Sequence, residues 1–514
     1  MTLVLLAFAA LFGLTLACAR TIQTDNPAFW SISGLSGETP TPEPELASLP
    51  VGFVPTRQPG APIASPTSDQ PHPLPAMRTE PRQHVVQAGE TLGQLARDNG
   101  ISLQQIIDAN QLANPDILEI GQVLNIPAPT PSGNGPDFKI IPDSELTNGP
   151  AAANFDLYTF IQSRGGYLAG YTEKLDPVVL TGPQIIDRIA TDYSVNPRVL
   201  LAVLEYQSHW VSQLNPAPAT LDYPMGLKDT QRKGLYRQLA WAADNLNRGY
   251  YLWRVNGVST WILSDGSVVP VSPTINAGTA GVQSMFAPLL GYTEWQQAVT
   301  LQGVFQSYVE LFGYPFDRAF EPVLPANLRQ PSMQLPFEPG KDWAFTGGPH
   351  GGWGDGSAWA ALDFAPPGDE LGCVLSNDWV VAVADGVIVR TGNGAVIQDL
   401  DQGVGQPGDG LEQTGWTVLY MHVETRDRVP PGTYVRAGDR IGHPSCEGGV
   451  STGTHVHLAR RYNGEWIPAD QTLPFILDGW VSRGTGDVYD GFLEKNGRTI
   501  EAYAGRSDNN GIQR

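Results

Sequence analysis

Residues 451–458 read Ser-Thr-Gly-Thr-His-Val-His-Leu, and this stretch decides how the C-terminal part of the chain is interpreted. Successive side chains of a β-strand point to opposite faces. His455 and His457 are therefore predicted to share one face while Val456 packs on the other. Two imidazoles on one face suit two metal ligands, or one ligand and one acid–base group. Two histidines at this spacing in a strand have a purely structural role about as often. The surrounding residues must therefore show whether the pair belongs to a functional site.

The surrounding region, residues 335–478, alternates short apolar runs with Gly and Pro turns, which predicts an antiparallel β domain. Asp363 ends one apolar run, and His422 ends another that carries Tyr420 at the same two-residue spacing. His350 lies in a glycine-dense loop, which is expected to fold back and bring its ring to Asp363. Four histidines and an aspartate near glycine turns of one β domain favour a metal centre over a purely structural role.

Five motifs of this region occur in an order that identifies a family by resemblance. They are GPHGGW (348–353), AALDF (360–364), VLYMH (418–422), VRAGDRIG (435–442) and GGVSTGTHVHL (448–458). Together they resemble the lysostaphin-type, LytM-like zinc endopeptidases of cell walls. The long spacing from His350 to Asp363 resembles the β-lytic, staphylolysin-like subgroup.

The resemblance implies a role for each candidate residue. His350, Asp363 and His457 would bind Zn²⁺, while His422 and His455 would flank an open position and move protons during peptide-bond hydrolysis. Two histidines and a carboxylate also describe a non-haem iron site, but iron chemistry has no use for the two additional histidines. His443 has no role in the family, and a hydrogen bond within its loop is expected.

Residues 83–128 predict a small strand–helix–helix–strand module, with Ser102 and Gln105 forming a capping box. The segments VVQAGETLGQLARDNGIS and NPDILEIGQVLNIP resemble the LysM module, which implies binding of peptidoglycan glycans. The implied groove lies between two loops, Gly89, Glu90 and Thr91 in one and Pro115, Asp116 and Ile117 in the other. The alternative is a spacer that binds nothing.

Residues 151–330, which follow a linker at 129–150, predict a mostly helical domain. Residues 196–208 weakly resemble the glutamate-bearing helix of lysozyme-like lytic transglycosylases. The family's Glu-Ser pair reads Gln207-Ser208, and an amide cannot donate the proton that glycosidic cleavage requires. Glu205 lies about 200° around the helix and cannot take that place. A structural or glycan-holding domain is expected.

The N-terminal residues predict export. Residues 3–17 form an apolar signal segment. The small residues before Cys18 resemble the lipobox of bacterial lipoproteins. This resemblance implies that Cys18 is acylated and could anchor the protein to a membrane. Residues 19–82 form a proline-rich tether. Export would place Cys373 and Cys446 in an oxidising compartment, where they are predicted to pair; two free buried thiols are the alternative.

The overall composition agrees with several domains and excludes one class of partner. The 514 residues predict about three or four domains. With 31 basic and 52 acidic residues the net charge is −21, so nucleic acid is not an expected partner.

The sequence therefore predicts a multidomain α+β chain with a β-hairpin extension at residues 479–514, whose polar end is expected to fray. The predicted function is an exported peptidoglycan hydrolase of the cell envelope that cleaves peptide bonds. Two other functions stay open. One is a non-catalytic envelope protein that binds peptidoglycan or activates other hydrolases, and the other is a glycan-cleaving enzyme that acts through residues 151–330.

Overall fold

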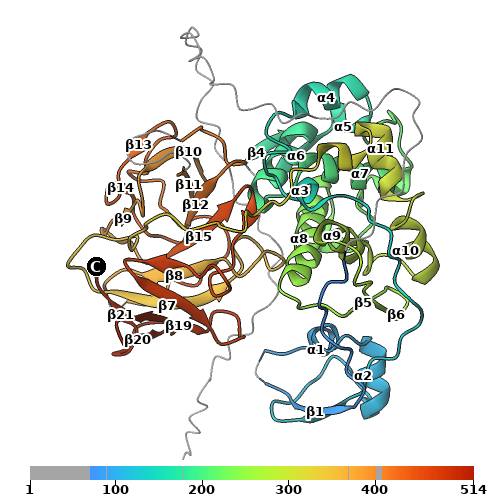
Figure 1. Cartoon of the computed structure of the whole chain (residues 1–514), viewed down its shortest axis with the longest axis horizontal. Helices are drawn as coiled ribbons and strands as arrows, with labels where there is room; N and C mark the ends of the chain where they lie inside the picture. Colours follow the sequence, from blue (N-terminus) through green and yellow to red (C-terminus); the bar gives the residue numbers. More distant parts are fainter. Residues whose placement is uncertain (1–69, 88, 176, 369, 401–407) are drawn as a thin grey trace, which may run out of the picture. The chain divides into compact units, whose positions relative to one another are not determined.

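The computed structural model describes residues 70–514 except 88, 176, 369 and 401–407 (Figure 1). The predicted signal segment, Cys18 and most of the proline-rich tether lie outside the described residues. Within the described part, no helix is both long and apolar enough to cross a membrane. The described chain divides into two compact units, Met77–Thr130 and Pro131–Arg514, the second also taking in residues 70–76.

The first unit has the predicted order of strand, helix, helix and strand. Its elements are β1 (Arg82–Val85), α1 (Leu92–Asp98), α2 (Leu103–Asn110) and β2 (Val123–Ile126). The strands pair antiparallel, with Arg82 opposite Ile126. The capping box is confirmed, because the Ser102 hydroxyl accepts from the Gln105 amide while the Gln105 side chain accepts from the Ser102 amide. The apolar faces of both helices meet β2 in a small core.

The second unit begins with a helical region. Its helices are α3 (Asp143–Leu146), α4 (Leu157–Arg164), α5 (Tyr167–Gly170), α6 (Gly182–Tyr193), α7 (Pro197–Ser208), α8 (Leu235–Arg254), α9 (Ala277–Phe286), α10 (Tyr292–Ala298) and α11 (Val304–Phe312). Two hairpins join them, β3 (Thr172–Leu175) with β4 (Val178–Thr181) and β5 (Thr260–Ile262) with β6 (Val268–Pro270). Asn196 caps α7 and Pro197 is its first residue, a combination that favours a helix start.

A large antiparallel sheet follows, and its described strands run in the order β13-β10-β11-β12-β15-β8-β7-β21, with β16 also paired to β15. The bounds are β7 (Trp343–His350), β8 (Ala361–Ala365), β10 (Gly386–Gly392), β11 (Ala395–Asp399), β12 (Trp416–Met421), β13 (Tyr434–Val435), β15 (Val456–Tyr462), β16 (Glu465–Trp466) and β21 (Gly511–Ile512). Beside it lie the pair β9 (Val380–Val381) with β14 (Arg440–Gly442), and the sheet β17 (Ile476–Leu477), β18 (Trp480–Gly484), β19 (Gly491–Lys495) and β20 (Arg498–Glu501).

The two faces of the large sheet belong to different cores. Along β15, Val456 and Leu458 point into the core of the β region, whereas Ala459 belongs to the core of the helices. Ala361 of β8 and Ala395 of β11 also face the helices, and their small side chains let the helices approach the sheet closely. The helical region thus covers one face of the sheet.

The C-terminal extension contains antiparallel hairpins, as expected, and differs from the expectation only at its end. Residues 480–501 form three strands of a sheet, and the last strand, β21, pairs with β7 at the edge of the large sheet. Ile512 is fully buried and lies opposite Trp343. The expectation of a frayed end was wrong because Ile512, a single apolar residue in a polar segment, fills the core beneath that edge.

Candidate metal centre

Three strands bring His350, Asp363 and His457 together. Asp363 of β8 lies directly opposite His457 of β15, and His350 is the last residue of β7, opposite Ala361. The distances between ligand atoms are 3.2 Å from Asp363 Oδ1 to His350 Nε2, 3.2 Å from Asp363 Oδ1 to His457 Nδ1, and 2.9 Å between the two nitrogens. Among the described residues, these three side chains form a group that could hold a metal ion.

The outward-facing nitrogen of each ligand ring is held by a backbone carbonyl. His350 Nδ1 donates to the Gly348 oxygen at 2.8 Å, and His457 Nε2 donates to the Gly352 oxygen at 3.1 Å. A carbonyl can only accept, so each of these nitrogens carries the proton. The other nitrogen of each neutral ring therefore presents a lone pair to Asp363. Such carbonyl partners fix the tautomer and orientation of metal-binding histidines.

This arrangement fits a cation. Three lone-pair atoms converge, and Asp363 Oδ1 is buried without accepting a hydrogen bond. A tetrahedral zinc site with bonds of about 2.0–2.1 Å places neighbouring ligand atoms about 3.3 Å apart. The measured separations of 2.9–3.2 Å are close to that value. Two imidazoles and one carboxylate also form a donor set that zinc accepts in catalytic sites.

His422 and His455 lie beside this group. Their ring centroids are 4.5 Å apart, and His455 Nε2 is 3.8 Å from Asp363 Oδ1. Each again donates its outer N–H to a carbonyl, His422 to Glu447 at 3.1 Å and His455 to Gly453 at 2.7 Å. Both Nε2 atoms are therefore free to accept a proton near the three-residue group.

Burial and charge set the protonation states of the centre. Burial raises the pKa of Asp363, but the imidazoles of His350 and His455 more than offset this and hold its pKa well below the usual value. Burial lowers the pKa of His457, although Asp363 opposes the shift. Burial lowers the pKa of His422 to about 3, and the neighbouring imidazoles of His455 and His457 add to this shift. Near pH 7 the Asp363 carboxylate is therefore charged, and the rings of His422 and His457 are neutral.

Tyr420 does not share the site with His422, although strand alternation places them on one face. Its hydroxyl donates to Gln398 and accepts from the Val383 amide inside the β core. His422 follows the end of β12 with a φ of 65°, which breaks the alternation and turns its ring toward His455. A non-glycine residue with positive φ gives no clear signal in sequence. His443 makes a hydrogen bond, as expected, but to another segment, because its Nδ1 donates to the Asp378 carbonyl at 2.8 Å.

Tyr489 is a neighbour of the centre that the sequence did not reveal. Its ring stacks on His350 with centroids 4.2 Å apart and an interplanar angle of 21°. It comes from the loop between β18 and β19, inside the C-terminal β-hairpin extension. No motif marks it, because the contact depends on how that hairpin folds over the end of β7.

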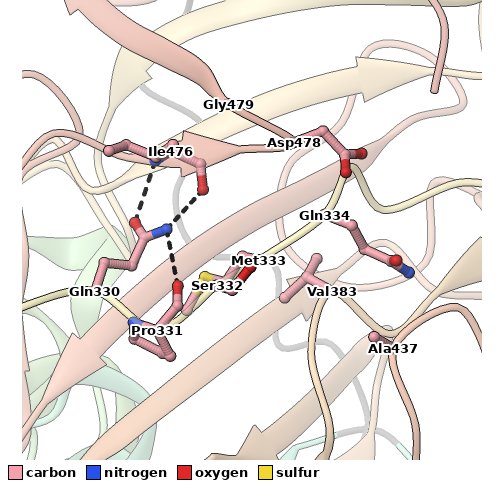
Figure 2. Close-up of a pocket in the computed structure, with 10 residues that line it drawn as sticks. All are labelled: Gln330, Pro331, Ser332, Met333, Gln334, Val383, Ala437, Ile476, Asp478 and Gly479. Carbon is pink, nitrogen blue, oxygen red and sulfur yellow. Dashed lines mark hydrogen bonds between the residues drawn. The ribbon is translucent and has the colours of Figure 1, made fainter.

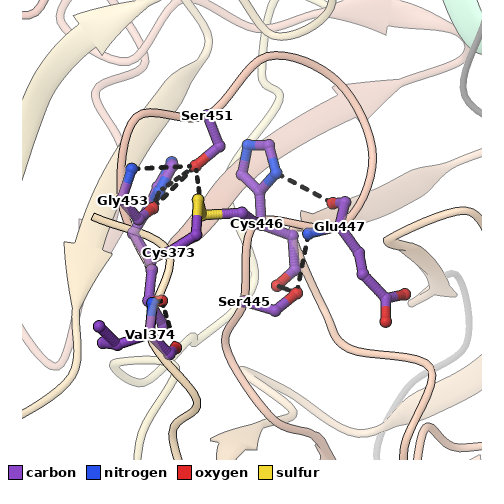
Figure 3. The surroundings of a disulfide bond; sticks show 10 residues. Cys373, Val374, Ser445, Cys446, Glu447, Ser451 and Gly453 are labelled. Atoms are coloured by element: carbon purple, nitrogen blue, oxygen red, sulfur yellow. Dashed lines mark hydrogen bonds between the residues drawn. A yellow bond between two sulfur atoms is a disulfide. The ribbon is translucent and has the colours of Figure 1, made fainter.

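The disulfide Cys373–Cys446 ties together the loops behind His422 and His455 (Figure 3). Glu447, next to Cys446, supplies the carbonyl that holds His422, and the Ser451 hydroxyl lies within 3.4 Å of both Cys446 Sγ and His455 Nδ1. The bond spans 73 residues, which corresponds to about 4 kcal/mol of loop-closure stabilisation. It supports the two outer histidines and contributes no metal ligand.

A surface pocket of about 380 Å³ lies elsewhere in the β region (Figure 2). Its lining includes Gln330, Met333 and Asp478, and none of the site histidines. The Gln330 side chain is engaged with the backbone of Ile476 through both its oxygen and its nitrogen. The pocket therefore plays no part in the candidate centre.

Glu205 and Gln207, the residues at and near the position of the family's acid glutamate, make structural contacts. Glu205 accepts hydrogen bonds from the Val211 amide and from the Ser212 amide and hydroxyl, which closes the turn after α7. The Gln207 amide donates to the Met225 carbonyl. These contacts favour a structural role for α7 over glycan cleavage.

The proposed LysM groove residues lie on two loops at the surface of the first unit. Thr91 caps α1, and Glu90 accepts from the Gln87 amide and contacts His84. Gly89, Pro115, Asp116 and Ile117 are exposed, and Ile117 exposes 63% of its surface. An apolar side chain this exposed is available to a ligand.

Comparison with known families agrees with this organisation. The LysM domain model matches residues 84–127, the model of the LasA N-terminal domain matches 139–325, and the model of peptidase family M23 matches 370–468. The chain contains an M23 metallopeptidase domain. His350 and Asp363 precede the matched range, so their assignment to the site depends on the geometry above. M23 metallopeptidases depend on zinc, which agrees with the donor set.

The chain is homologous to two named proteases. It is 26% identical to protease LasA of Pseudomonas aeruginosa over 327 residues, which is 58% of this chain and 71% of that protein. It is 28% identical to beta-lytic metalloendopeptidase of Lysobacter enzymogenes over 178 residues, 32% of this chain and 90% of that protein. Among solved structures, the M23 metalloprotease pseudoalterin from the deep sea aligns with 25% identity, covering 37% of this chain and 100% of that chain, with a TM-score of 0.29.

Proposed function

We propose that the protein is an exported peptidoglycan hydrolase that uses one zinc ion to cleave peptide bonds in cell-wall stems or cross-bridges. The observation that carries the proposal is the convergence of three unprotonated ligand atoms, from His350, Asp363 and His457, within hydrogen-bond distance of one another. The M23 match and the metalloendopeptidase relatives support the reaction class.

The residues of the site divide into two roles. His350, Asp363 and His457 would hold the zinc, which supplies a Lewis acid and activates water for hydrolysis at neutral pH. His455 Nε2 would accept the proton of the attacking water and return it to the leaving amine. The His455 residue is partly exposed whereas His422 is buried, so His455 exchanges protons with solvent more readily.

His422 would act as a second hydrogen-bonding group. Its pKa of about 3 keeps the ring neutral, and Nδ1–H is committed to the Glu447 carbonyl. Nε2 can therefore accept from a water or from a substrate N–H. His422 would orient the reacting groups while His455 moves the proton.

The remaining parts of the chain would bring the centre to its substrate. The LysM match supports a glycan-binding role for the loops that contain Glu90 and Ile117. The apolar segment 3–17 supports export, and Cys18 is the candidate for lipid anchoring. Lipidation would be tested by mass spectrometry of the N-terminal peptide of the exported protein.

The function is tested by digesting purified cell walls with the full chain after zinc loading. We expect new amino termini in the digest and their loss in the His455→Ala variant. New reducing or anhydro sugar ends would instead indicate glycan cleavage. Zinc-loaded protein that binds walls and releases neither kind of end would support the non-catalytic alternative.

A further inference from the structure

The loop that joins the ligand strands β7 and β8, residues 351–360, lies against helix α8 of the helical region. The Gly356 amide donates to Asp244 Oδ1 at 2.8 Å. A Cβ at Gly356 would lie 1.9 Å from the Asp244 carbonyl oxygen, and one at Gly354 would lie 2.5 Å from Asp244 Oδ1. Two of the loop's glycines are therefore required by the close approach of α8, because any side chain would push the loop away.

The same loop holds a ligand of the candidate centre. Its Gly352 carbonyl accepts from His457 Nε2, and the Gly352 amide is bound to the Ala358 carbonyl at 3.0 Å across the loop. A Cβ at Gly352 would lie 2.6 Å from the Trp466 ring, so the strand pair β15–β16 also packs tightly on the loop. A shift of the loop would move the Gly352 carbonyl and release the ring of His457.

We propose that Asp244 is a positioning residue for the metal centre. By anchoring the loop to α8, its carboxylate fixes the Gly352 carbonyl, which orients His457, and it also steadies the end of β7 that carries His350. The inference rests on the part of the proposed function in which His350, Asp363 and His457 bind zinc. It assigns the helical region a direct part in building the centre.

Further contacts hold the helical region and the β region together around the contact of Asp244 with the loop. Arg390 of the large sheet binds Glu412 and also Asp192 of α6 at 3.0 Å. Glu465 of β16 accepts from Arg254 and Tyr250 of α8 at 2.9 and 3.0 Å. Removal of the helical region would leave buried Glu465 without Arg254 and Tyr250 and would take Asp192 away from Arg390. The test therefore uses the full chain.

The test compares zinc affinity among matched variants, measured by competition with a chromogenic chelator on the metal-free proteins. Asp244→Ala is expected to weaken zinc binding about tenfold, as loss of an outer partner of a ligand does. Asp244→Asn keeps an oxygen acceptor for Gly356 and should stay within about threefold of the wild type. Gly356→Ala breaks the same contact from the side of the loop and should resemble Asp244→Ala.

The control is Ser194→Ala, which removes a buried hydrogen bond to the Gly464 carbonyl between the same two regions without touching the loop. Its zinc affinity should equal that of the wild type, although the thermal midpoint of the metal-free protein falls. Equal weakening by Ser194→Ala and Asp244→Ala would overturn the proposal, since the effect would then be general destabilisation. The proposal would also be overturned if Asp244→Ala and Gly356→Ala both bound zinc with wild-type affinity. The same holds if Asp244→Asn bound zinc as weakly as Asp244→Ala.

The result separates this inference from the proposed function. A wild-type protein that binds zinc but cleaves no wall peptide would overturn the peptidase function and leave the effect of Asp244 on zinc affinity measurable. A normal wall digest with unchanged affinity in the Asp244 and Gly356 variants would overturn only the positioning role.

Discussion

His457 and Asp363 lie directly opposite each other on the antiparallel strands β15 and β8, with His457 Nδ1 3.2 Å from Asp363 Oδ1. Directly opposed residues of neighbouring strands are held at a nearly constant separation by the sheet. Two of the three candidate ligands are thus fixed by the sheet, whereas the third, His350, stands where β7 gives way to the glycine loop.

The two histidines of the His-Val-His motif are expected to respond differently to substitution. His457→Ala removes a ligand that the sheet holds against Asp363, so it should abolish stoichiometric zinc. His455→Ala should retain zinc and lose wall-cleaving activity, because His455 Nε2 lies outside the three-residue group at 3.8 Å from the carboxylate. Metal analysis of the purified proteins checks both. Zinc loss in both variants would contradict the assigned roles.

The disulfide is expected to position His422 and His455 and to have no effect on zinc binding. Replacing Cys373 and Cys446 together with Ser should lower the free energy of unfolding by about 4 kcal/mol. Activity should fall, because Glu447 and Gly453 then hold His422 and His455 less firmly, while zinc content stays stoichiometric. Denaturant unfolding, metal analysis and wall digestion measure the three effects. Full activity in the folded double variant would show that the disulfide only stabilises the fold.

Buried Glu145 in the helical region predicts a pH-dependent stability. Burial raises its pKa to about 7, against the charge of Arg198 and the hydrogen bond from Tyr308, which lower it. Between pH 4.5 and 7 the folded state therefore holds one more proton than the unfolded state, so stability falls as pH rises through this range. Glu145→Gln stays neutral.

The size of this effect can be measured by denaturant unfolding at pH 5 and pH 8. The Gln variant should lose about 2–3 kcal/mol less stability than the wild type over this interval, because one proton contributes about 1.4 kcal/mol per pH unit. The same pH dependence in both proteins would show that Glu145 is charged throughout the range.

Ile117 is expected to contribute to glycan binding by the LysM unit. Ile117→Asp should weaken sedimentation with insoluble peptidoglycan about tenfold, since burying an isoleucine contributes about 1.5–3 kcal/mol. Leu103→Asp is the matched control, because Leu103 is exposed on α2 outside both loops. Equal loss in both variants, or none in either, would remove Ile117 from the glycan site.

The fold was predictable from sequence wherever a local pattern determines it. The Ser102 capping box and the Asn196-Pro197 helix start are local signals, and the structure contains both. The joining of the helical and β regions into one unit was not predictable. Ala361 and Ala395 lie on the helix-facing side of the sheet. Alanine is common in any buried strand, so the sequence does not mark these positions as an interface with the helices.

For the candidate site, strand alternation was informative and backbone turns were not. Alternation predicts that His455 and His457 share a face, and both have a ring nitrogen within 4 Å of Asp363 Oδ1. His422 departs from alternation through its positive φ, and Tyr489 reaches His350 from a distant hairpin. The glycine loop was expected to fold back, but its fit against Asp244 depends on a helix more than a hundred residues earlier.

We infer that His350 completes a three-residue zinc site with Asp363 and His457. An anomalous difference map collected at the zinc edge from crystals of the zinc-loaded full chain tests it most directly. We predict one peak about 2.0–2.1 Å from His350 Nε2, Asp363 Oδ1 and His457 Nδ1. A peak bound by His455 or His422 in place of His350, or no peak between the three strands, would show that His350 is not a zinc ligand.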